Sequence, residues 1–493
     1  MRFRRFGRIA MTVPLALGLW CGCAAGGIGA EEILTATGVT SGLVGHVGCG
    51  EGKLTASMGA NEALLVHALD SDAKHISAAR KHIASRGLYG RVSADTFDGE
   101  NLPYIDNFVN LVVCEDLGAV KMTEVMRVLA PGGTAYVKKS GQWRKTLKPR
   151  PKKIDDWTHY LHGPDNNAVS QDTVAGPPRR MQWTAPPRWA RSHEGAPSIQ
   201  GVVSSAGRLF HVHDEGPVGM VDERFPSKWS LVARDAFNGV RLWKRDIGSW
   251  ADPNKYWLYC TPTPNRRIVA ADDRVYAALG AGRAVTVFDA ATGRTLAVYK
   301  DTESVGELVL YKGVLLAARP TAPVRRRKGK SPAAKTATGG VMALDVATGK
   351  RMWSVEGRLA PLSLLARGDV AMFIDGKDVV CSDLQTGKVR WRVASTSGSL
   401  VACEKAILVL HGKGVTAHSP ADGSVMWIHK QSIRGFVGPA EVFVIDGLVW
   451  LGGTGIGLDL QTGKIKRRIS VGVSPGHHHQ RIAPLLPVPP YPT

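Results

Sequence analysis

Asp345-Val-Ala-Thr348-Gly349-Lys-Arg-Met-Trp353 is the clearest copy of a short cassette that recurs along the second half of the chain. The cassette consists of an Asp, a turn that ends on a small polar residue and Gly, and a Trp four positions later. Similar copies run from Asp235 to Trp243 and from Asp383 to Trp391. Weaker copies begin at Asp289, Ser419 and Asp459. A strand–turn–strand unit that repeats this often indicates a repeat architecture.

Short β-rich runs precede the cassettes, and they are residues 208–213, 274–279, 313–317, 370–374, 406–410 and 448–451. The glycines of the last four cassettes are 38, 36 and 40 residues apart, which is the length of one four-stranded propeller blade. An insert rich in Pro, Lys and Arg, residues 319–338, stretches an earlier interval and is expected to be disordered. These features predict an all-β propeller over residues 156–475, followed by a Pro-rich tail, 476–493.

The cassettes are uneven. Trp stands at positions 243, 353, 391 and 427, but the corresponding positions of two copies hold Ala297 and Arg467. Six visible repeats are also fewer than a ring of seven or eight blades needs, so we expect an incomplete propeller whose last blade lacks a neighbour.

Residues 31–140 show α/β patterning instead. Apolar strand-like runs cover 43–47, 64–69 and 109–114, and residues 73–85 have helical spacing with Ile76, Ala79 and Ile83 on one face. We therefore predict two folded parts, a Rossmann-like α/β domain and the propeller, joined by a basic linker over residues 141–155.

The first thirty residues form a leader. Four arginines precede an apolar run from Ile9 to about Trp20, and small residues lead to Ala30. This layout predicts a signal peptide over residues 1–30 and export to the periplasm or cell envelope. The alternative is an uncleaved N-terminal membrane anchor.

The formal net charge of +21 is concentrated partly in two basic runs, residues 138–153 and 325–330. Such runs are usually solvated, and an anionic envelope surface is the partner that they would fit, whereas no specific nucleic-acid binding is expected. Five cysteines remain after the leader, with no CxxC pair, which argues against a disulfide framework and a zinc site.

The sharpest local motif is Gly48-Cys49-Gly50-Glu51-Gly52, directly after a strand. Glycines at this place let the backbone turn tightly and approach a ligand closely, ahead of a helix. The motif is neither a GxxxxGK[ST] phosphate loop nor a GxGxxG dinucleotide fingerprint. Asp70 ends the next strand, where its carboxylate could accept both hydroxyls of a ribose.

With these residues, the segment 31–140 resembles class I S-adenosylmethionine-dependent methyltransferases. Asp95 stands where the family's adenine-contacting acid falls, Asn101-Leu-Pro-Tyr104 looks like the element before the fourth strand, and Arg127 to Gly133 is similar to the turn into the fifth. The resemblance implies S-adenosylmethionine as cofactor. The residues that would bind it are Gly48, Gly50, Gly52, Asp70 and Asp95.

Two positions depart from the family pattern. His46 replaces an acidic residue before the first glycine, and Cys114-Glu115-Asp116-Leu117 stands in place of a motif that orients the nucleophile. Glu115 and Asp116 are the nearest candidates for a catalytic base, the alternative being two solvated acids at a strand end. The chain is thus a candidate methyltransferase, or else an envelope scaffold with a degenerate methyltransferase fold.

The cassettes resemble the repeats of pyrroloquinoline-quinone-type propellers, which occur in quinoprotein dehydrogenases and in the outer-membrane-assembly propeller. The resemblance implies that each Trp docks on a Thr-Gly turn of a neighbouring blade. Quinoproteins are expected to carry an adjacent Cys pair, which the mature chain lacks, so pyrroloquinoline quinone is an unlikely cofactor and quinone-dependent dehydrogenation the second alternative function. An envelope protein or a polysaccharide is the partner expected for the propeller.

Two histidine pairs, His159 with His162 and His211 with His213, have spacings that metal sites use. Hydrogen-bonded structural histidines are the more common explanation of such pairs, and no metal site is predicted.

Overall fold

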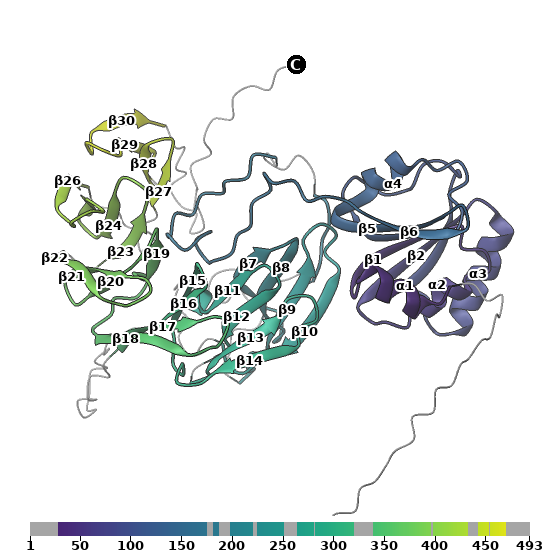
Figure 1. Cartoon of the computed structure of the whole chain (residues 1–493), viewed down its shortest axis with the longest axis horizontal. Coiled ribbons are helices and arrows are strands. Elements are labelled where there is room, and N and C mark those ends of the chain that lie inside the picture. The colour runs from purple at the N-terminus through teal and green to yellow at the C-terminus, as the bar shows by residue number, and fades with distance from the viewer. Residues whose placement is uncertain are drawn as a thin grey trace, which may run out of the picture.

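The computed structural model describes residues 28–174, 181–186, 198–219, 224–250, 264–280, 282–319, 339–395, 398–431, 442–452 and 454–469. A sheet flanked by helices lies at one end, and an arc of small sheets makes up the rest (Figure 1). The expected insert, the leader up to residue 27 and the Pro-rich tail lie outside the described residues.

The N-terminal sheet has the strand order β3-β2-β1-β4-β5-β6. The first five strands are parallel, and β6 pairs antiparallel with β5. The strands are β1 (Gly42–Val47), β2 (Leu64–Asp70), β3 (Val92–Thr96), β4 (Val109–Cys114), β5 (Leu129–Lys139) and β6 (Gln142–Leu147). The order reverses between β1 and β4, so this is a doubly wound sheet with its switch point there.

Helices cover both faces of this sheet. They are α1 (Ala30–Thr37), α2 (Lys53–Met58), α3 (Ala73–Ser85) and α4 (Met122–Val128). The first three share one apolar core with β1 and β2, and α4 packs on the other face. The predicted helix 73–85 is confirmed as α3, which buries Ile76, Ala79 and Ile83. The predicted boundary after residue 30 falls within the first turn of α1, because Ile28 and Ala30 already pack on this core.

The stretch 141–155 is not wholly a linker, since residues 142–147 form β6. Its basic side chains are partly engaged. The Lys145 ammonium donates to the carbonyl of Thr37 at 2.7 Å, that of Lys148 to the carbonyl of Leu129 at 2.7 Å, and Arg150 pairs with Asp156 at 2.7 Å. These cations therefore stabilise the N-terminal domain and the segment that leads from it to the propeller. No helix in the described ranges is both long and apolar enough to cross a membrane.

The rest of the described chain forms six four-stranded antiparallel sheets, each a meander in chain order. The first three comprise β7 (Ile199–Ser205), β8 (Arg208–Asp214), β9 (Trp229–Asp235), β10 (Arg241–Asp246); β11 (Ile268–Ala271), β12 (Arg274–Ala278), β13 (Val285–Asp289), β14 (Thr295–Tyr299); β15 (Glu307–Tyr311), β16 (Val314–Arg319), β17 (Gly339–Asp345) and β18 (Arg351–Gly357). The other three comprise β19 (Leu365–Arg367), β20 (Val370–Asp375), β21 (Asp378–Asp383), β22 (Val389–Ala394); β23 (Ser399–Ala402), β24 (Ile407–His411), β25 (Gly414–His418), β26 (Val425–Lys430); β27 (Val442–Ile445), β28 (Leu448–Leu451), β29 (Ile456–Asp459) and β30 (Ile465–Arg468).

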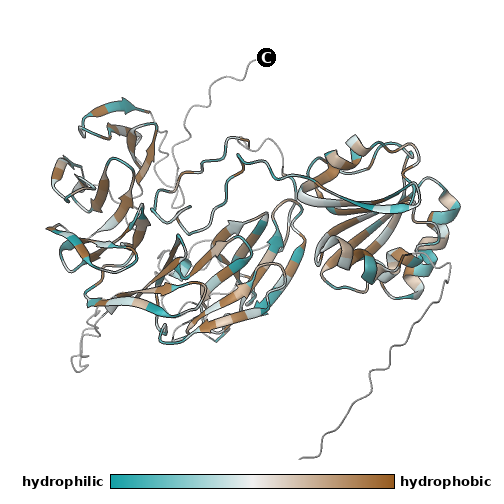
Figure 2. Cartoon of the chain, in the orientation of Figure 1, coloured by the Kyte–Doolittle hydropathy of each residue, from teal (hydrophilic) through white to brown (hydrophobic). Residues whose placement is uncertain are grey.

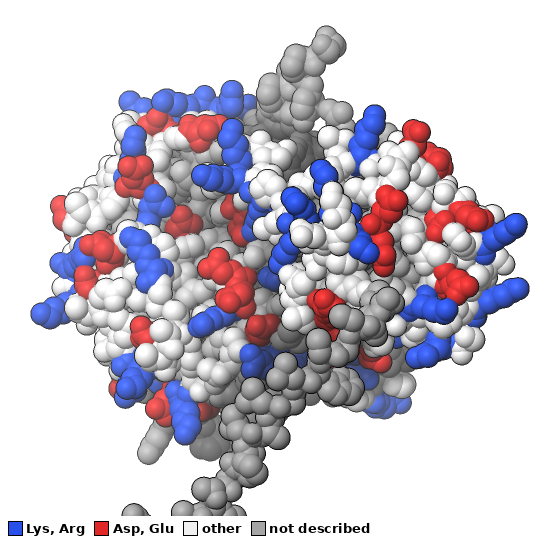
Figure 3. Space-filling view, turned by 45° about the vertical axis from the view of Figure 1, so that its right-hand side comes forward, with Lys and Arg blue, Asp and Glu red and all other residues white. Residues whose placement is uncertain are grey.

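These sheets confirm the predicted fold class, an α/β domain followed by a propeller. Each predicted β-rich run is the second strand of one sheet, and the apolar cores lie between successive sheets. Figure 2 shows brown, apolar residues concentrated on these central strands. The last strand, β30, is exposed throughout, and Lys and Arg gather over its position along the upper left edge in Figure 3.

Each cassette is the turn between the third and fourth strands of a sheet. In the third sheet, the Asp345 carboxylate accepts from the Thr348 amide at 2.8 Å and from its hydroxyl at 2.7 Å. Gly349 follows with φ +68°, a conformation that favours glycine. The Asp and Thr of the motif therefore close the turn, and the Gly lets it reverse.

An aromatic side chain from the preceding part of the chain, which for the last five sheets is the preceding sheet, covers each glycine and donates to a carbonyl in the turn. For Trp353, the indole N–H reaches the carbonyl of Leu384 at 2.9 Å, and a Cβ added to Gly387 would lie 2.7 Å from the ring. The pairs are Trp183–Gly239, Trp243–Gly293, Tyr299–Gly349, Trp353–Gly387, Trp391–Gly423 and Trp427–Gly463. The docking role that the sequence assigned to the Trp residues is thus observed from sheet to sheet.

Two docking residues differ from the sequence prediction. Tyr299, two positions after Ala297, docks for the second sheet, and its hydroxyl donates to the carbonyl of Val346 at 2.8 Å. Trp183 docks on the first cassette. It belongs to no repeat and lies in a segment that precedes the first sheet. Ala297 therefore does not mark a missing contact.

The first cassette also attaches the propeller to the N-terminal domain. The Asn238 amide donates to the carbonyl of Phe108 at 2.8 Å and to the side-chain oxygen of Asn110 at 2.7 Å. Asn110 in turn donates to Asp235 at 2.7 Å, and Val240 packs on the core beside α4. Burial here raises the pKa of Asp235, although its hydrogen bonds oppose this, whereas hydrogen bonds lower the pKa of Asp345 in the exposed third cassette.

Asn238→Thr is expected to weaken this attachment without disturbing the turn. Thr keeps the local bond that Asn238 makes to the Val240 amide, as Thr348 does for Lys350, but it loses the two bonds to the N-terminal domain. The loss of two partly buried hydrogen bonds should lower the stability of the α/β domain by about 2 kcal/mol, measured by calorimetric unfolding of the full chain. Thr348→Asn in the third cassette is the matched control and should leave that transition in place.

Candidate functional site

The candidate site lies at the carboxyl edge of the parallel strands, beside the switch point. The glycine loop leaves β1, Asp70 ends β2, and Glu115 and Asp116 follow β4. In open α/β sheets this edge is where ligands bind. The fold therefore brings together most of the residues that the sequence singled out.

The glycine loop is held by the end of β2. The amides of Gly48 and Cys49 donate to the carbonyl of Leu69 at 2.8 and 3.2 Å. All three motif glycines have positive φ, +71° at Gly48, +51° at Gly50 and +75° at Gly52. The loop thus needs glycine for its conformation, since other residues pay for this region of backbone space.

The three glycines differ in what surrounds them. A Cβ on Gly52 would lie 2.8 Å from the Cβ of Ala79, so this glycine lets α3 pack closely. A Cβ on Gly50 would meet no heavy atom within 4 Å, and one on Gly48 would meet only the carbonyl oxygen of Asp116 at 3.8 Å. Gly48 and Gly50 therefore border open space that a ligand can fill.

Asp70 joins the loop to β2. Its Oδ2 accepts from the Gly50 amide at 3.0 Å and its Oδ1 from the Asp72 amide at 2.9 Å, and His75 approaches Oδ1 at 3.2 Å. Burial raises the pKa of Asp70, but these three interactions outweigh it and leave the pKa below its usual value. The carboxylate is ionised at neutral pH and retains acceptor capacity for a ribose.

Two side chains beside the loop are chemically inert. Burial, with the nearby Asp70, raises the pKa of Cys49 to about 12, so the thiol stays protonated. His46 is buried, its Nδ1 lies 2.7 Å from the Thr55 hydroxyl, and burial lowers its pKa to about 4 despite the charge of Asp70. His46 is therefore a neutral link between β1 and α2.

Asp95, at the end of β3, is already engaged. Its carboxylate pairs with Arg80 at 2.5 Å and with the Nε2 of His67 at 3.1 Å, and the Nδ1 of His67 contacts the Tyr104 hydroxyl at 2.9 Å. This chain of contacts fixes the loop before β4 to the sheet. The adenine contact predicted for Asp95 would have to compete with Arg80.

Asp98 and Gly99 were missed by the sequence reasoning. A Cβ on Gly99 would lie 3.7 Å from the Cβ of Ser71, directly after Asp70, and Gly99 has φ +87°. Hydrogen bonds from Asn101 and Glu100 lower the pKa of Asp98. The Asp-Gly pair ahead of Asn101-Leu-Pro-Tyr104 is the signal in the sequence that could have pointed to this second acid.

The two candidate bases lie at the same edge. Glu115 is half-exposed and pairs with Lys138 at 3.7 Å, whereas the Asp116 carboxylate caps the Gly118 amide at 3.0 Å. Cys114 is buried, and burial raises its pKa to about 12. The pairing of Glu115 with Lys138 is thus longer than the hydrogen bond that Asp116 accepts.

The propeller does not touch this edge in the described ranges. Its contacts are to Phe108 and Asn110, at the amino-terminal end of β4. A cavity of about 260 Å³ lies between the two domains at this end, and the loop before β1, residues 37–41, lines it. The glycine loop and Asp70 lie at the opposite ends of the strands.

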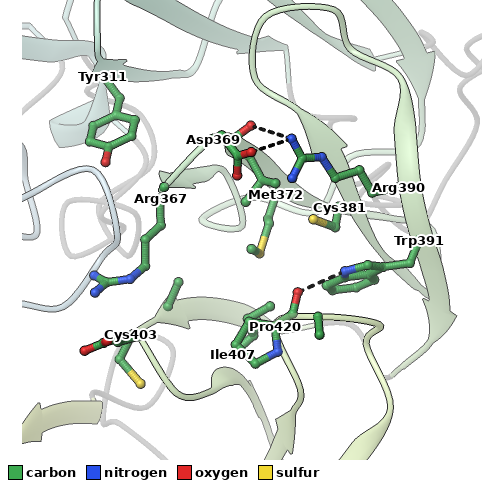
Figure 4. A pocket seen from close by; sticks show the side chains of 15 residues that line it. Tyr311, Arg367, Asp369, Met372, Cys381, Arg390, Trp391, Cys403, Ile407 and Pro420 are labelled. Carbon is green, nitrogen blue, oxygen red and sulfur yellow. Dashed lines mark hydrogen bonds and ion pairs between the residues drawn. The ribbon is translucent and has the colours of Figure 1, made fainter.

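Other predicted or reactive groups do not form a second site. The described residues contain no group of three His, Cys, Asp or Glu placed to hold a metal. A cavity of about 550 Å³ between the fourth and fifth sheets is shown in Figure 4. Its cations are paired, Arg390 with Asp369 at 2.7 Å and Arg367 with Asp165 at 3.1 Å, and burial raises the pKa of Cys381 to about 11.

Together, a doubly wound sheet with this edge and a set of docked blades define a methyltransferase-type domain fused to a β-propeller. A family model described as a methyltransferase domain matches residues 44–133. A model described as outer membrane protein assembly factor BamB matches residues 188–355 and 337–480. Because the second match spans more than half of the 493 residues, the chain belongs to the BamB family. Both resemblances found in the sequence are confirmed.

Individual relatives are similar to parts of the chain. Methyltransferase GfsG of Streptomyces halstedii is 34% identical over 94 residues, 18% of this chain and 34% of the relative. The chain thus spans about a third of that relative. A SAM-dependent methyltransferase from Methanosarcina mazei is 20% identical, with a TM-score of 0.19, and the match covers 21% of this chain and 55% of that one. BamB from Moraxella catarrhalis is 14% identical, with a TM-score of 0.32, over 54% of this chain and 78% of that one.

Proposed function

We propose that the N-terminal domain binds S-adenosylmethionine at its carboxyl edge and transfers a methyl group to an acceptor in the cell envelope. The observation that carries the proposal is the bond between the Gly50 amide and the Asp70 carboxylate, which sets an ionised acid beside a glycine loop bordering open space. The match to a methyltransferase family supports it.

The cofactor would supply an activated methyl group on a sulfonium. Asp70 would accept the two ribose hydroxyls, and Gly48 and Gly50 would let the backbone approach. Gly99 lies near Ser71, and its neighbour Asp98 would be an acid available to the far side of the nucleoside. As the acceptor gains the methyl, it loses a proton, and Glu115 is the carboxylate that would take it. Proximity accounts for most of the rate that such a transfer needs.

The propeller would act as the interaction domain. The family match to an outer membrane assembly factor and the predicted leader favour an envelope location, with an envelope protein or polysaccharide as partner. The exposed basic strand β30 offers a surface to anionic groups. Sequencing the N terminus of the mature protein and fractionating the cell will show whether the domain meets the cytoplasmic pool of S-adenosylmethionine.

A second candidate function is that of an envelope scaffold whose methyltransferase fold does not transfer methyl groups. The buried neutral His46 in place of an acid and the capping role of Asp116 favour it. The two candidates differ in one measurement, because only the first requires affinity for the cofactor.

Titration of S-adenosylmethionine into the full chain by calorimetry is expected to give saturable binding. Asp70→Asn should weaken it about 30-fold, because two bonds from the ribose to a charged acceptor become bonds to a neutral one. The amide oxygen can keep the bond from Gly50 but not also the one from the Asp72 amide, so calorimetric unfolding of the variant must show that the domain is still folded.

Asp95→Asn is the matched control. Because Asp95 is occupied by Arg80 and His67, this variant should bind nearly as well as the parent if Asp98 is the acid beside the nucleoside. A large loss for Asp95→Asn would instead support the adenine contact predicted from the sequence. Absence of any heat with the parent chain would remove the methyltransferase proposal and leave the scaffold.

A further inference from the structure

A segment between the two domains runs along the inner ends of all six propeller sheets. We name residues 155–167 the strap. In Figure 1 its dark blue trace leaves the N-terminal domain and reaches the region of β15, β19 and β27. The first strands of successive sheets lie next to one another there, from β7 to β23. These strands are sheet edges, whose amides lack a partner within the sheet.

The strap supplies one acceptor to the first strand of every sheet, in chain order. The carbonyl of Trp157 accepts from Ser204 at 2.7 Å and that of Thr158 from Ala270 at 3.0 Å. The Nε2 of His159 accepts from the Leu310 amide at 3.0 Å. The remaining bonds run from Ala366 to Pro164 at 2.8 Å, from Ala402 to Asp165 at 3.0 Å and from Val444 to Asn167 at 2.9 Å.

Two asparagines add further side-chain contacts between the strap and the sheets. Asn167 also donates to the carbonyl of Val444 at 2.9 Å, so its amide pairs with β27 in both directions. Asn166 is buried and donates to the carbonyls of Leu364 and Leu400 at 3.1 and 3.0 Å, which bridges the fourth and fifth sheets. Its φ of +62° is one that Asn tolerates better than most residues.

A buried ion pair between Arg266 and Glu307 also contacts Asn166. Arg266 donates to the side-chain oxygen of Asn166 at 2.9 Å and pairs with Glu307 at 3.4 Å, and both charged groups are almost fully buried. Glu307 in turn accepts from the amide of Leu364 at 3.4 Å. The second, third and fourth sheets therefore converge on one strap residue.

Both histidines of the strap have structural roles in its turn. His159 and His162 exchange backbone hydrogen bonds at 3.1 Å, and His162 pairs with Asp155 at 2.6 Å. Burial, with the charges of Arg266 and His162, lowers the pKa of His159 to about 3. The neutral ring accepts from Leu310 and contacts the Thr158 hydroxyl at 2.7 Å, so neither nitrogen is open to a metal.

We propose that the groove lined by the six first strands is a binding site for an extended peptide, and that its ligand is the chain's own strap. The strap satisfies the edge amides, sets the spacing of the sheets and occupies the axis of the arc. A ligand with two successive carboxamide side chains fits the groove, because Asn166 and Asn167 make the contacts that backbone alone cannot. This proposal does not depend on the function of the N-terminal domain.

The test is hydrogen exchange on the full chain carrying Asn166→Ala and Asn167→Ala. Amides of β19, β23 and β27 are expected to exchange about tenfold faster or more, because local opening of these strands no longer breaks the strap contacts. Ser170→Ala with Gln171→Ala is the matched control, since these side chains bond to Asp155 and Val169 and to no sheet. Equal protection in the two double variants would overturn the proposal.

A second measurement covers the case in which the asparagine variant loses its whole fold. Residues 157–167 are replaced in the full chain by a glycine-serine segment of equal length, and a synthetic peptide of residues 155–168 is added. The peptide should restore protection of the first strands, and a peptide with alanine at both asparagine positions should not. Failure of the native peptide, or equal rescue by both peptides, would contradict a groove that recognises the strap.

Discussion

Glu307→Gln is expected to lower the free energy of unfolding of the propeller by about 3–5 kcal/mol, because removing one charge of a buried pair leaves the other uncompensated. Arg266 and Glu307 have side chains that are only 4% and 1% exposed, so water cannot replace the lost partner. Gln keeps the size of Glu, but its single oxygen can accept from only one of the two amides, Leu362 or Leu364, so the effect combines the lost charge with one lost acceptor. Denaturant unfolding of the full chain measures it.

Asp369→Asn is the control for this effect. Asp369 pairs with Arg390 at 2.7 Å, which is shorter than the Arg266–Glu307 contact, but the two side chains are 74% and 39% exposed. Solvent screens such a pair, so its loss should cost far less than the loss of the buried pair. A Glu307→Gln effect no larger than that of Asp369→Asn would mean that the buried pair does not hold the sheets together.

Much of the fold followed from local patterns in the sequence. The apolar spacing over residues 73–85 predicted the helix α3, and the short apolar runs predicted the second strands of the sheets. The cassettes fixed the turns because Asp, Thr and Gly each have a distinct hydrogen-bonding or conformational task there. The first and fourth strands lie at the edges of each sheet. A first strand such as β19 is short and a fourth strand such as β22 is largely exposed, so the apolar pattern of both is weak.

The contacts that the sequence did not reveal join distant segments. Tyr299 takes a Trp position after a shift of two residues, and Trp183 docks from outside the repeats. Asp95 is occupied by Arg80 from α3, which a motif comparison does not reveal. The strap could not be found either, because most of its partners are backbone amides, and any sequence can supply those.

In the candidate site, too, local patterns were predicted from the sequence and contacts between distant segments were not. Gly48, Gly50 and Asp70 were identified from their places after two strands, and the fold brings them together. Asp95 lies within β3, whereas Asp98 lies past the end of this strand, and its neighbour Gly99 lies near Ser71. The binding test with Asp95→Asn decides between the two acids.

The two glycines Gly50 and Gly52 should separate binding from folding in the N-terminal domain. Gly52→Ala places a Cβ 2.8 Å from that of Ala79 at a backbone φ of +75°. The left-handed conformation and the crowding against α3 should together cost about 2–5 kcal/mol, so the domain is expected to unfold first in calorimetry. Loss of cofactor binding in this variant is then a consequence of lost structure.

Gly50→Ala has the same type of conformational cost but no steric clash, since nothing lies within 4 Å of the added Cβ. The domain should lose only about 1–2 kcal/mol and remain folded at 25 °C. Affinity for S-adenosylmethionine should nevertheless fall about tenfold or more, because the methyl group enters the space that the ligand needs and the Gly50 amide must shift from Asp70. Unchanged affinity in a folded Gly50→Ala chain would mean that this glycine serves only the turn, and the open space beside it would then have no role in binding.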